Sequence, residues 1–167
     1  MKKACVVGGS NGIGLAITLE LLHNGYHVYV VDISNPDYTV LNDTKNYTYI
    51  KCNLLDFYTE TFRDIANDKE LELLMITAGF GRVAHFESLS LGEVTNILSV
   101  NAVSTIKIIK IFYDKIKSHE KFYCGIMGSI AGFINSPLFS VYGASKAAIC
   151  RFVESVKNEH YKRNRVD

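Results

Sequence analysis

The amino-acid sequence predicts an α/β fold in which a doubly wound parallel sheet lies between two layers of helices. Short apolar runs alternate with segments of helical periodicity along the whole chain, and this alternation is typical of strands joined by crossover helices. Hydrophobic residues make up 48% of the 167 residues, which is enough for the core of one domain. We therefore expect a single domain over residues 1–167, with ligands at the carboxyl ends of its strands.

The predicted strands are apolar runs without strict alternation, as expected of strands that are buried on both faces of a parallel sheet. A polar, turn-like stretch over 33–46 separates the second run from the third. The five runs cover 4–7, 28–31, 47–52, 71–76 and 123–127.

Helical periodicity follows most of these runs. A first helix is predicted over 13–22, and Gly25 stops it because glycine adopts the left-handed conformation at low cost. Shorter and longer helices are predicted over 59–65 and 142–161. The apolar residues of the first helix that we expect to face the core are Ile13, Ala16, Ile17 and Leu21.

The longest helix is predicted to begin at a capping box. Ser90 and Glu93 have the spacing at which each side chain satisfies a free amide of the first turn. Apolar residues continue at helical spacing as far as Phe112, and the lysines between and after them are expected on a solvated face. These lysines are Lys107, Lys110 and Lys117.

Charge and cysteine usage exclude several classes of protein. The formal net charge is +1, so neither nucleic acid nor a membrane surface is an expected partner. No apolar run is expected to span a bilayer or serve as a signal peptide, and no spacing suggests a metal site. The 4 cysteines form no Cys-x-x-Cys pair, so we expect free thiols and a cytoplasmic protein.

A glycine-rich turn joins the first predicted strand to the first helix. Glycine there permits a sharp turn and a close approach of the backbone to a pyrophosphate, while the amides of the helix start attract phosphate. Glycine clusters also occur in strand-to-helix turns without a ligand, but the position after the first strand favours a Rossmann-type dinucleotide site. The residues assigned to it are Gly8, Ser10, Asn11, Gly12, Ile13 and Gly14.

An acidic residue ends the second predicted strand. A carboxylate at Asp32 can accept both hydroxyls of an adenosine ribose and would repel a 2′-phosphate, which favours NAD(H) over NADP(H). Ile33 is assigned to the same site. The alternative is an ordinary loop aspartate that starts a turn.

The spacing G-x-x-x-G-x-G in the glycine turn resembles the loop of the short-chain dehydrogenase/reductase family. Val7 stands where that family usually has threonine, which implies the loss of one loop hydrogen bond. Residues 76–79 resemble the family's N-N-A-G motif with both asparagines replaced, which implies weaker side-chain support of the strand that ends there. The resemblance adds four residues to the cofactor site, namely Asn53, Leu54, Ala78 and Gly79.

Four residues match the catalytic tetrad of that family: Asn101, Ser129, Tyr142 and Lys146. On a helix Tyr142 and Lys146 are neighbours, and the lysine cation favours the phenolate. The resemblance implies that Tyr142 exchanges a proton with the substrate oxygen, to which Ser129 hydrogen-bonds. It also implies that Tyr142 and Lys146 both belong to the cofactor site, where Lys146 binds the nicotinamide ribose. Asn101 would kink its helix and hold a water that relays protons through Lys146.

The resemblance covers essentially the whole chain and implies an NAD(H)-dependent oxidoreductase that interconverts a small-molecule carbonyl and its alcohol. Family members are usually longer, so the chain resembles one without the last strands and the C-terminal substrate-binding part. A catalytically silent fragment that binds nucleotide and dimerises is therefore the alternative. In the family, the helices that carry Asn101 and Tyr142 pack against their copies, which implies a homo-oligomer. Nucleic-acid binding by the basic end, 157–165, is less favoured, because cations are common at helix C-termini.

Overall fold

The computed structural model describes residues 1–36, 46–56, 59–118 and 121–163. These residues form two compact units, the first made of residues 1–78 and 110–127, and the second of residues 79–109 together with the chain from 128 onward. Most of the turn predicted over 33–46, and the last residues of the basic end, lie outside the described residues.

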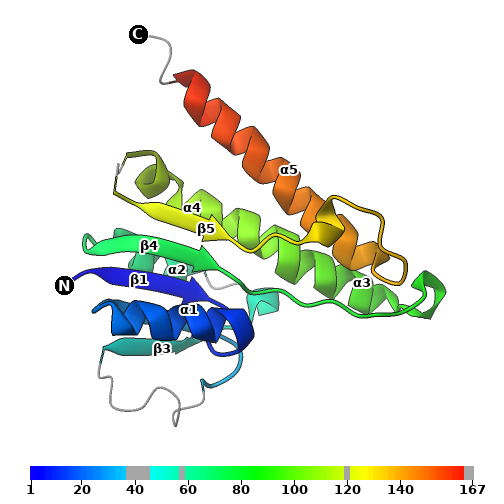
Figure 1. Ribbon diagram of the computed structural model, residues 1–167, viewed down its shortest axis with the longest axis horizontal. Helices are drawn as coiled ribbons and strands as arrows, with labels where there is room; N and C mark the ends of the chain where they lie inside the picture. Colours follow the sequence, from blue (N-terminus) through cyan, green and yellow to red (C-terminus); the bar gives the residue numbers. More distant parts are fainter. Residues whose placement is uncertain (37–45, 57–58, 119–120, 164–167) are drawn as a thin grey trace. The chain divides into compact units, whose positions relative to one another are not determined.

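The first unit contains a 5-stranded parallel sheet in the order β3-β2-β1-β4-β5, flanked by helices α1 (Gly12–His23) and α2 (Thr59–Asn67) (Figure 1). This confirms the predicted doubly wound α/β fold, and the strand order reverses between β1 and β4, where such sheets bind ligands. The strands are β1 (Lys3–Val7), β2 (His27–Asp32), β3 (Tyr47–Lys51), β4 (Leu71–Ile76) and β5 (Tyr123–Ile126).

The central strands form the core of this unit. β1 is buried from Ala4 to Val7, and Val28 and Val30 of β2 are fully buried beside it. A strand covered on both faces needs apolar side chains at every position, which is why these runs lack the alternation of a half-exposed strand. The short 3₁₀ turn η1 (Leu54–Asp56) follows β3 directly.

Helix α1 (Gly12–His23) buries only part of the face that its apolar spacing predicts. Ile17 and Leu21 are half-buried and pack against the core of the first unit, as expected. Ile13 is 61% exposed and Ala16 is exposed, whereas Gly14, Thr18 and Leu22 are buried. The expectation was wrong for Ile13 and Ala16, and it omitted Thr18, whose hydroxyl is satisfied inside the protein because it donates to the carbonyls of Gly9 (3.1 Å) and Gly14 (3.0 Å). A threonine whose hydroxyl is satisfied by backbone can occupy a core position that apolar periodicity alone assigns elsewhere.

The second unit is mainly helical. It contains α3 (Leu91–Leu98), the π-helical segment η3 (Ser99–Val103), the first part of α4 (Ser104–Ser118), the short turns η2 (Phe86–Ser88) and η4 (Ile130–Gly132), and α5 (Ser140–Arg163). The capping box at the start of α3 is confirmed, with Ser90 accepting from the amide of Glu93 and the Glu93 side chain accepting from the amide of Ser90. The three lysines predicted on the solvated face are exposed.

One helical stretch, Leu91–Lys117, is long and apolar enough by composition alone to cross a membrane, contrary to our expectation from the sequence. The stretch buries Asn101, Ser104 and Thr105 together with apolar residues such as Ile108 and Phe112. Polar side chains buried among apolar ones are expected of a helix packed inside a folded protein, so this composition is weak evidence for a span.

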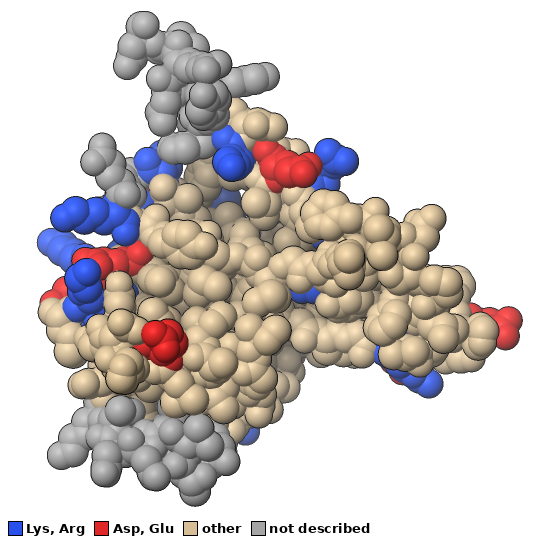
Figure 2. Space-filling view, in the orientation of Figure 1, with Lys and Arg blue, Asp and Glu red and all other residues tan. Residues whose placement is uncertain are grey.

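Most described residues of the face seen in Figure 2 are uncharged, and where charges gather, Lys or Arg side chains lie beside Asp or Glu side chains. All four cysteines are free, as predicted. Burial raises the pKa of the Cys124 thiol to about 11, so that thiol is not activated for chemistry.

A half-buried charge network lies at the amino ends of β1 and β4. Lys3 donates from Nζ to Oδ2 of Asp68 at 2.8 Å, and the hydroxyl of Tyr29 donates to the same oxygen at 2.7 Å. Lys115 donates to the backbone carbonyl of Asp68. Burial alone would raise the pKa of Asp68, but hydrogen bonds from Lys3, Tyr29 and the amide of Glu70 outweigh it and lower the pKa to about 2.

We predict that Asp68 contributes to stability in a pH-dependent way. Because its pKa in the folded protein lies below the ordinary 3.8, the contribution is complete above about pH 4 and is lost as the pH falls toward 2. Asp68→Asn should lower the free energy of unfolding at pH 7 by roughly 1–3 kcal/mol and reduce its fall in acid. Urea unfolding from pH 7 to 2.5 measures both effects, with Asp64→Asn on exposed α2 surface as the control. An unchanged acid dependence in Asp68→Asn would contradict the assignment.

Candidate functional site

The turn between β1 and α1 is packed too closely for any residue but glycine at two positions. A Cβ on Gly8, which has a φ of +85°, would lie 2.5 Å from the amide nitrogen of Ala78. A Cβ on Gly14 would lie 1.9 Å from the carbonyl oxygen of Gly8. The turn therefore presses against the end of β4, and α1 begins directly on it, which is the arrangement the glycine spacing predicts.

Asp32 holds this turn from the end of β2. Its Oδ2 accepts from the amide of Ser10 at 2.9 Å, and its Oδ1 accepts from the amide of Ser34 at 3.0 Å. The carboxylate therefore lies beside the glycine turn, where the predicted ribose contact requires it. The carboxylate also starts a local turn at Ser34. Asp32 can therefore start a turn and still face the expected ribose site.

The hydroxyl of Ser10 is buried and has no hydrogen-bond partner among the described residues. Such an oxygen is costly to leave unsatisfied, and its presence at a helix start is expected where a ligand completes the bond. Ile13 and Ile33 are 61% and 56% exposed, so the turn also offers apolar surface. Asn11 is the N-cap of α1 but makes no side-chain capping bond. Gly12 has a φ of +52° with open space where a Cβ would be.

Thr77 joins the ends of β1 and β4, where Val7 and residues 76–79 depart from the family pattern. Its hydroxyl lies 2.9 Å from the carbonyl of Val7 and 3.1 Å from that of Gly8. The amides of Thr77 and Ala78 also donate to the carbonyl of Val7, at 2.8 and 3.0 Å. The hydroxyl missing at Val7 on β1 is thus provided from the end of β4, and sequence reasoning missed this exchange because it compared each motif separately.

Asn53 lies at the start of η1, after β3. Its Oδ1 accepts from the amide of Leu55 at 3.1 Å and its Nδ2 donates to Asp56 at 3.0 Å. The side chain thus shapes the η1 turn, while its oxygen retains one further lone pair for a ligand amine. Leu54 is half-buried beside it.

A dinucleotide fits the residues of the first unit. The glycine turn leads into the start of α1, and the buried hydroxyl of Ser10 in it has no partner among the described residues. The Asp32 carboxylate and the exposed side chains of Ile13 and Ile33 border the same turn. These are the donors, the acceptor and the apolar contacts that a pyrophosphate, a ribose and an adenine require.

In the second unit, Asn101 lies in the π-helical segment and is 1% exposed. Its Oδ1 accepts from the amide of Phe80 (2.9 Å), and its Nδ2 donates to the carbonyl of Phe80 (2.8 Å) and to Oγ of Ser145 (3.0 Å). Its own carbonyl accepts from the hydroxyl of Thr105 at 2.9 Å. The helix irregularity predicted at Asn101 is present, and a π segment of this kind is frequent at functional sites. Both Nδ2 protons of the side chain have acceptors, and the backbone carbonyl keeps one lone pair at which a relay water could bind.

Tyr142 and Lys146 lie one turn apart on α5. The Lys146 Nζ is 5.8 Å from the centroid of the Tyr142 ring, and Lys146 is only 4% exposed. Burial lowers the pKa of the Lys146 ammonium, which a weaker interaction with Cys150 opposes. A Cβ on Gly79 would lie 3.5 Å from Nζ of Lys146 and 3.1 Å from Oδ1 of Asn101. The unit therefore brings Gly79, Asn101, Tyr142 and Lys146 together.

Ser129 caps η4, where its Oγ accepts from the amide of Ala131 at 3.2 Å. This turn is packed tightly on α5, since a Cβ on Gly132 would lie 2.9 Å from the carbonyl carbon of Lys146. Ser129 is thus placed at the start of a segment fixed against the Tyr142–Lys146 turn. Sequence reasoning missed two neighbours of Tyr142: Phe139, whose ring centroid lies 5.8 Å from that of Tyr142, and Gly81, where a Cβ would meet the tyrosine ring at 2.8 Å.

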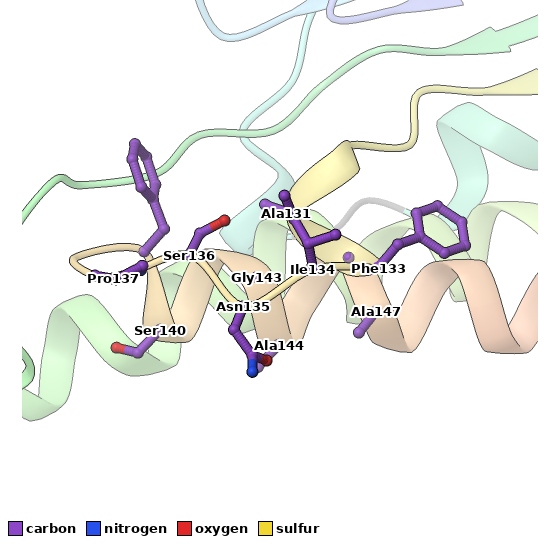
Figure 3. Close-up of a pocket in the computed structure, with 12 residues that line it drawn as sticks. Ala131, Phe133, Ile134, Asn135, Ser136, Pro137, Ser140, Gly143, Ala144 and Ala147 are labelled. Carbon is purple, nitrogen blue, oxygen red and sulfur yellow. The ribbon is translucent and has the colours of Figure 1, made fainter.

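A groove of about 530 Å³ runs between the segment after η4 and the first turns of α5 (Figure 3). Phe133 and Ile134 border it on the loop side, and Ala144 and Ala147 border it on the helix side. Asn135 and Ser136 are among its polar residues, and no charged side chain lines it among the described residues.

Comparison with known proteins identifies relatives over nearly the whole chain. The family model of the short chain dehydrogenases matches residues 2–167. Carbonyl reductase family member 4 of Xenopus tropicalis is 30% identical over 172 residues, which cover 98% of this chain and 72% of that protein. Among solved structures, ElxO with NADP bound has a TM-score of 0.82 at 20% identity, covering 96% of this chain and 68% of that one. The bulky-bulky ketone specific alcohol dehydrogenase of Comamonas testosteroni has a TM-score of 0.84 at 18% identity, covering 95% and 67%.

Proposed function

Because the chain belongs to the short-chain dehydrogenase/reductase family of oxidoreductases, we propose that it interconverts a small-molecule carbonyl and its alcohol with NAD(H). The observation that carries this proposal is the buried Lys146 beside Tyr142, in a unit where the buried Asn101 side chain hydrogen-bonds to Phe80 and Ser145. A lysine this buried is retained at a cost and is frequent in active sites. The carbonyl reductase named among the relatives supports the substrate class.

The dinucleotide would be held mainly by the first unit. The amides of the glycine turn would bind the pyrophosphate, with the Ser10 hydroxyl as an additional donor. Asp32 would accept the ribose hydroxyls, and Asn53 would accept from the adenine amine. When bound, the nicotinamide supplies or accepts the hydride. We favour NAD(H) because a 2′-phosphate would meet the Asp32 carboxylate, although a solved relative in fold carries NADP.

Tyr142 would donate a proton to the carbonyl oxygen in reduction and take one from the hydroxyl in oxidation. The Lys146 cation stabilises the phenolate that is left after donation, and its desolvation strengthens that interaction. Ser129 would donate a hydrogen bond to the same substrate oxygen and stabilise its developing charge. A water on the free lone pair of the Asn101 carbonyl would return the proton through Lys146.

We also propose a homo-oligomer formed through the helices that carry Asn101 and Tyr142. Val103 is 46% exposed on η3, and α5 borders an uncharged groove whose loop side exposes Phe133 and Ile134. Apolar side chains exposed beside a helix face of small residues suit close packing of two helices. Sedimentation equilibrium tests this, and a chain that stays monomeric at all concentrations would contradict it.

We propose the cytoplasm as the compartment, because all four cysteines are free and disulfides are rare where thiols are kept reduced. Fractionation of cells that express the chain would test this assignment, and recovery in an oxidising compartment would overturn it.

The first prediction for this function concerns nucleotide preference. NADH should bind more tightly than NADPH by at least about tenfold, since placing a phosphate against a carboxylate costs more than ~1.4 kcal/mol. Asp32→Ala should weaken NADH binding and reduce the preference, whereas Asp64→Ala should change neither. Fluorescence titration with each nucleotide measures the affinities. Equal affinities for NADH and NADPH in the unaltered chain would contradict the role of Asp32. If neither nucleotide bound, the proposed function itself would be contradicted.

The second prediction concerns the proton donor. Tyr142→Phe should lower kcat for carbonyl reduction by about 10²–10⁴-fold, the usual contribution of a general acid, while NADH affinity stays the same. Steady-state kinetics with a panel of ketones measures this, and Tyr123→Phe on an exposed part of β5 is the control. Turnover that survives in Tyr142→Phe would exclude Tyr142 as the proton donor. Nucleotide binding without turnover in the unaltered chain would instead favour the silent, nucleotide-binding form.

A further inference from the structure

We propose that Ser145 is a positioning residue that binds the Tyr142 turn of α5 to Asn101 and, through Asn101, to the segment at Phe80. Ser145 lies outside the four residues assigned to the chemistry and outside those assigned to the cofactor site. Its effect on turnover rests on the proposed function, whereas the contacts that carry the inference do not.

The hydroxyl of Ser145 has both of its hydrogen-bonding roles filled inside the protein. Ser145 is fully buried. Its Oγ donates to the carbonyl of Tyr142 at 2.7 Å and accepts from Nδ2 of Asn101 at 3.0 Å. A serine in a helix commonly bonds to a carbonyl of its own preceding turn. Here the same hydroxyl also receives a donor from another helix, so it joins the two.

Asn101 extends this connection to the chain after β4. Its side chain pairs with both the amide and the carbonyl of Phe80, at 2.9 and 2.8 Å. A continuous series of hydrogen bonds therefore runs from the carbonyl of Tyr142, through Ser145 and Asn101, to the backbone of Phe80. Ser145 and Asn101 are both buried, so neither side chain can exchange its partner for water without cost.

The segment held in this way lies against both reactive side chains. A Cβ on Gly79 would lie 3.5 Å from Nζ of Lys146, and a Cβ on Gly81 would lie 2.8 Å from the ring of Tyr142. A displacement of this segment relative to α5 would therefore change the surroundings of Tyr142 and Lys146 together. Without the Ser145 hydroxyl, one Nδ2 proton of Asn101 loses its acceptor. The orientation of the Asn101 side-chain amide is then fixed by its bonds to Phe80 alone.

The test compares Ser145→Ala and Ser145→Cys with Ser155→Ala. Alanine favours the helix and removes the hydroxyl, and cysteine keeps the volume with a much weaker donor. The Ser155 hydroxyl donates to the carbonyl of Arg151 at 2.9 Å on the exposed side of the same helix. Ser155→Ala therefore removes an intrahelical hydroxyl-to-carbonyl bond of the same kind, without a link to Asn101.

Two readouts are expected to change together. Exchange of the Phe80 amide proton with solvent, measured by NMR, should become about tenfold faster in both Ser145 variants, as the loss of one buried hydrogen bond predicts. In the Asn101→Ala background, Ser145→Ala should add nothing further to that rate, because the two residues act in one series. The kcat should fall by about tenfold while NADH affinity stays the same.

The proposal is overturned if the Phe80 exchange rate in Ser145→Ala equals that of the unaltered chain. It is also overturned if Ser145→Cys keeps wild-type exchange, which would assign the effect to volume, or if exchange quickens while kcat does not change. A chain that shows no turnover in any form would defeat the proposed function instead. In that case, the exchange measurement alone would still decide the link between Ser145 and Phe80.

Discussion

Parallel pairing of the strands is the constraint on which the nucleotide-binding part depends. Val7 lies in register with Val31 on one side and with Ile76 on the other. Parallel strands all end at one edge of their sheet, so the residues that come after them are gathered there by the pairing itself. Gly8 and Thr77 come directly after two of these strands, and Asp32 ends a third. The Thr77 hydroxyl lies against the carbonyl of Gly8, and the Asp32 carboxylate accepts from the amide of Ser10 in the glycine turn.

That edge is packed so closely that the residues proposed to bind the nucleotide also hold the turn together. The carbonyl of Gly8 lies where a Cβ on Gly14 would have to be, and it accepts from the Thr77 hydroxyl. Asp32 accepts a hydrogen bond from the amide of Ser10, and the same carboxylate is the group proposed to bind the ribose. Substituting such a residue to change nucleotide binding is expected to change the conformation of the turn as well.

Features that depend on burial or on local bonds were the ones best predicted from sequence. The strands were found within about one residue of their observed ends because a strand covered on both faces has apolar residues throughout. The capping box at Ser90 was found because it is a local bond. On α1, sequence reasoning was right for Ile17 and Leu21 and wrong for Ile13 and Ala16. It did not foresee Thr18, which is buried through bonds to Gly9 and Gly14. It also missed the Thr77 hydroxyl and the Ser145 link, since both depend on groups brought near by the fold rather than by spacing in the chain.

The proposed chemistry requires first of all that a dinucleotide bind at the carboxyl edge of the sheet in the first unit. Backbone amide chemical shifts, recorded by NMR during a titration with NADH, test this binding most directly. We expect the largest changes at residues 8–14 and at Asp32, Ile33 and Asn53, and no change at the opposite strand ends, around Lys3 and Asp68. Changes confined to other parts of the chain, or no changes at saturating NADH, would contradict it.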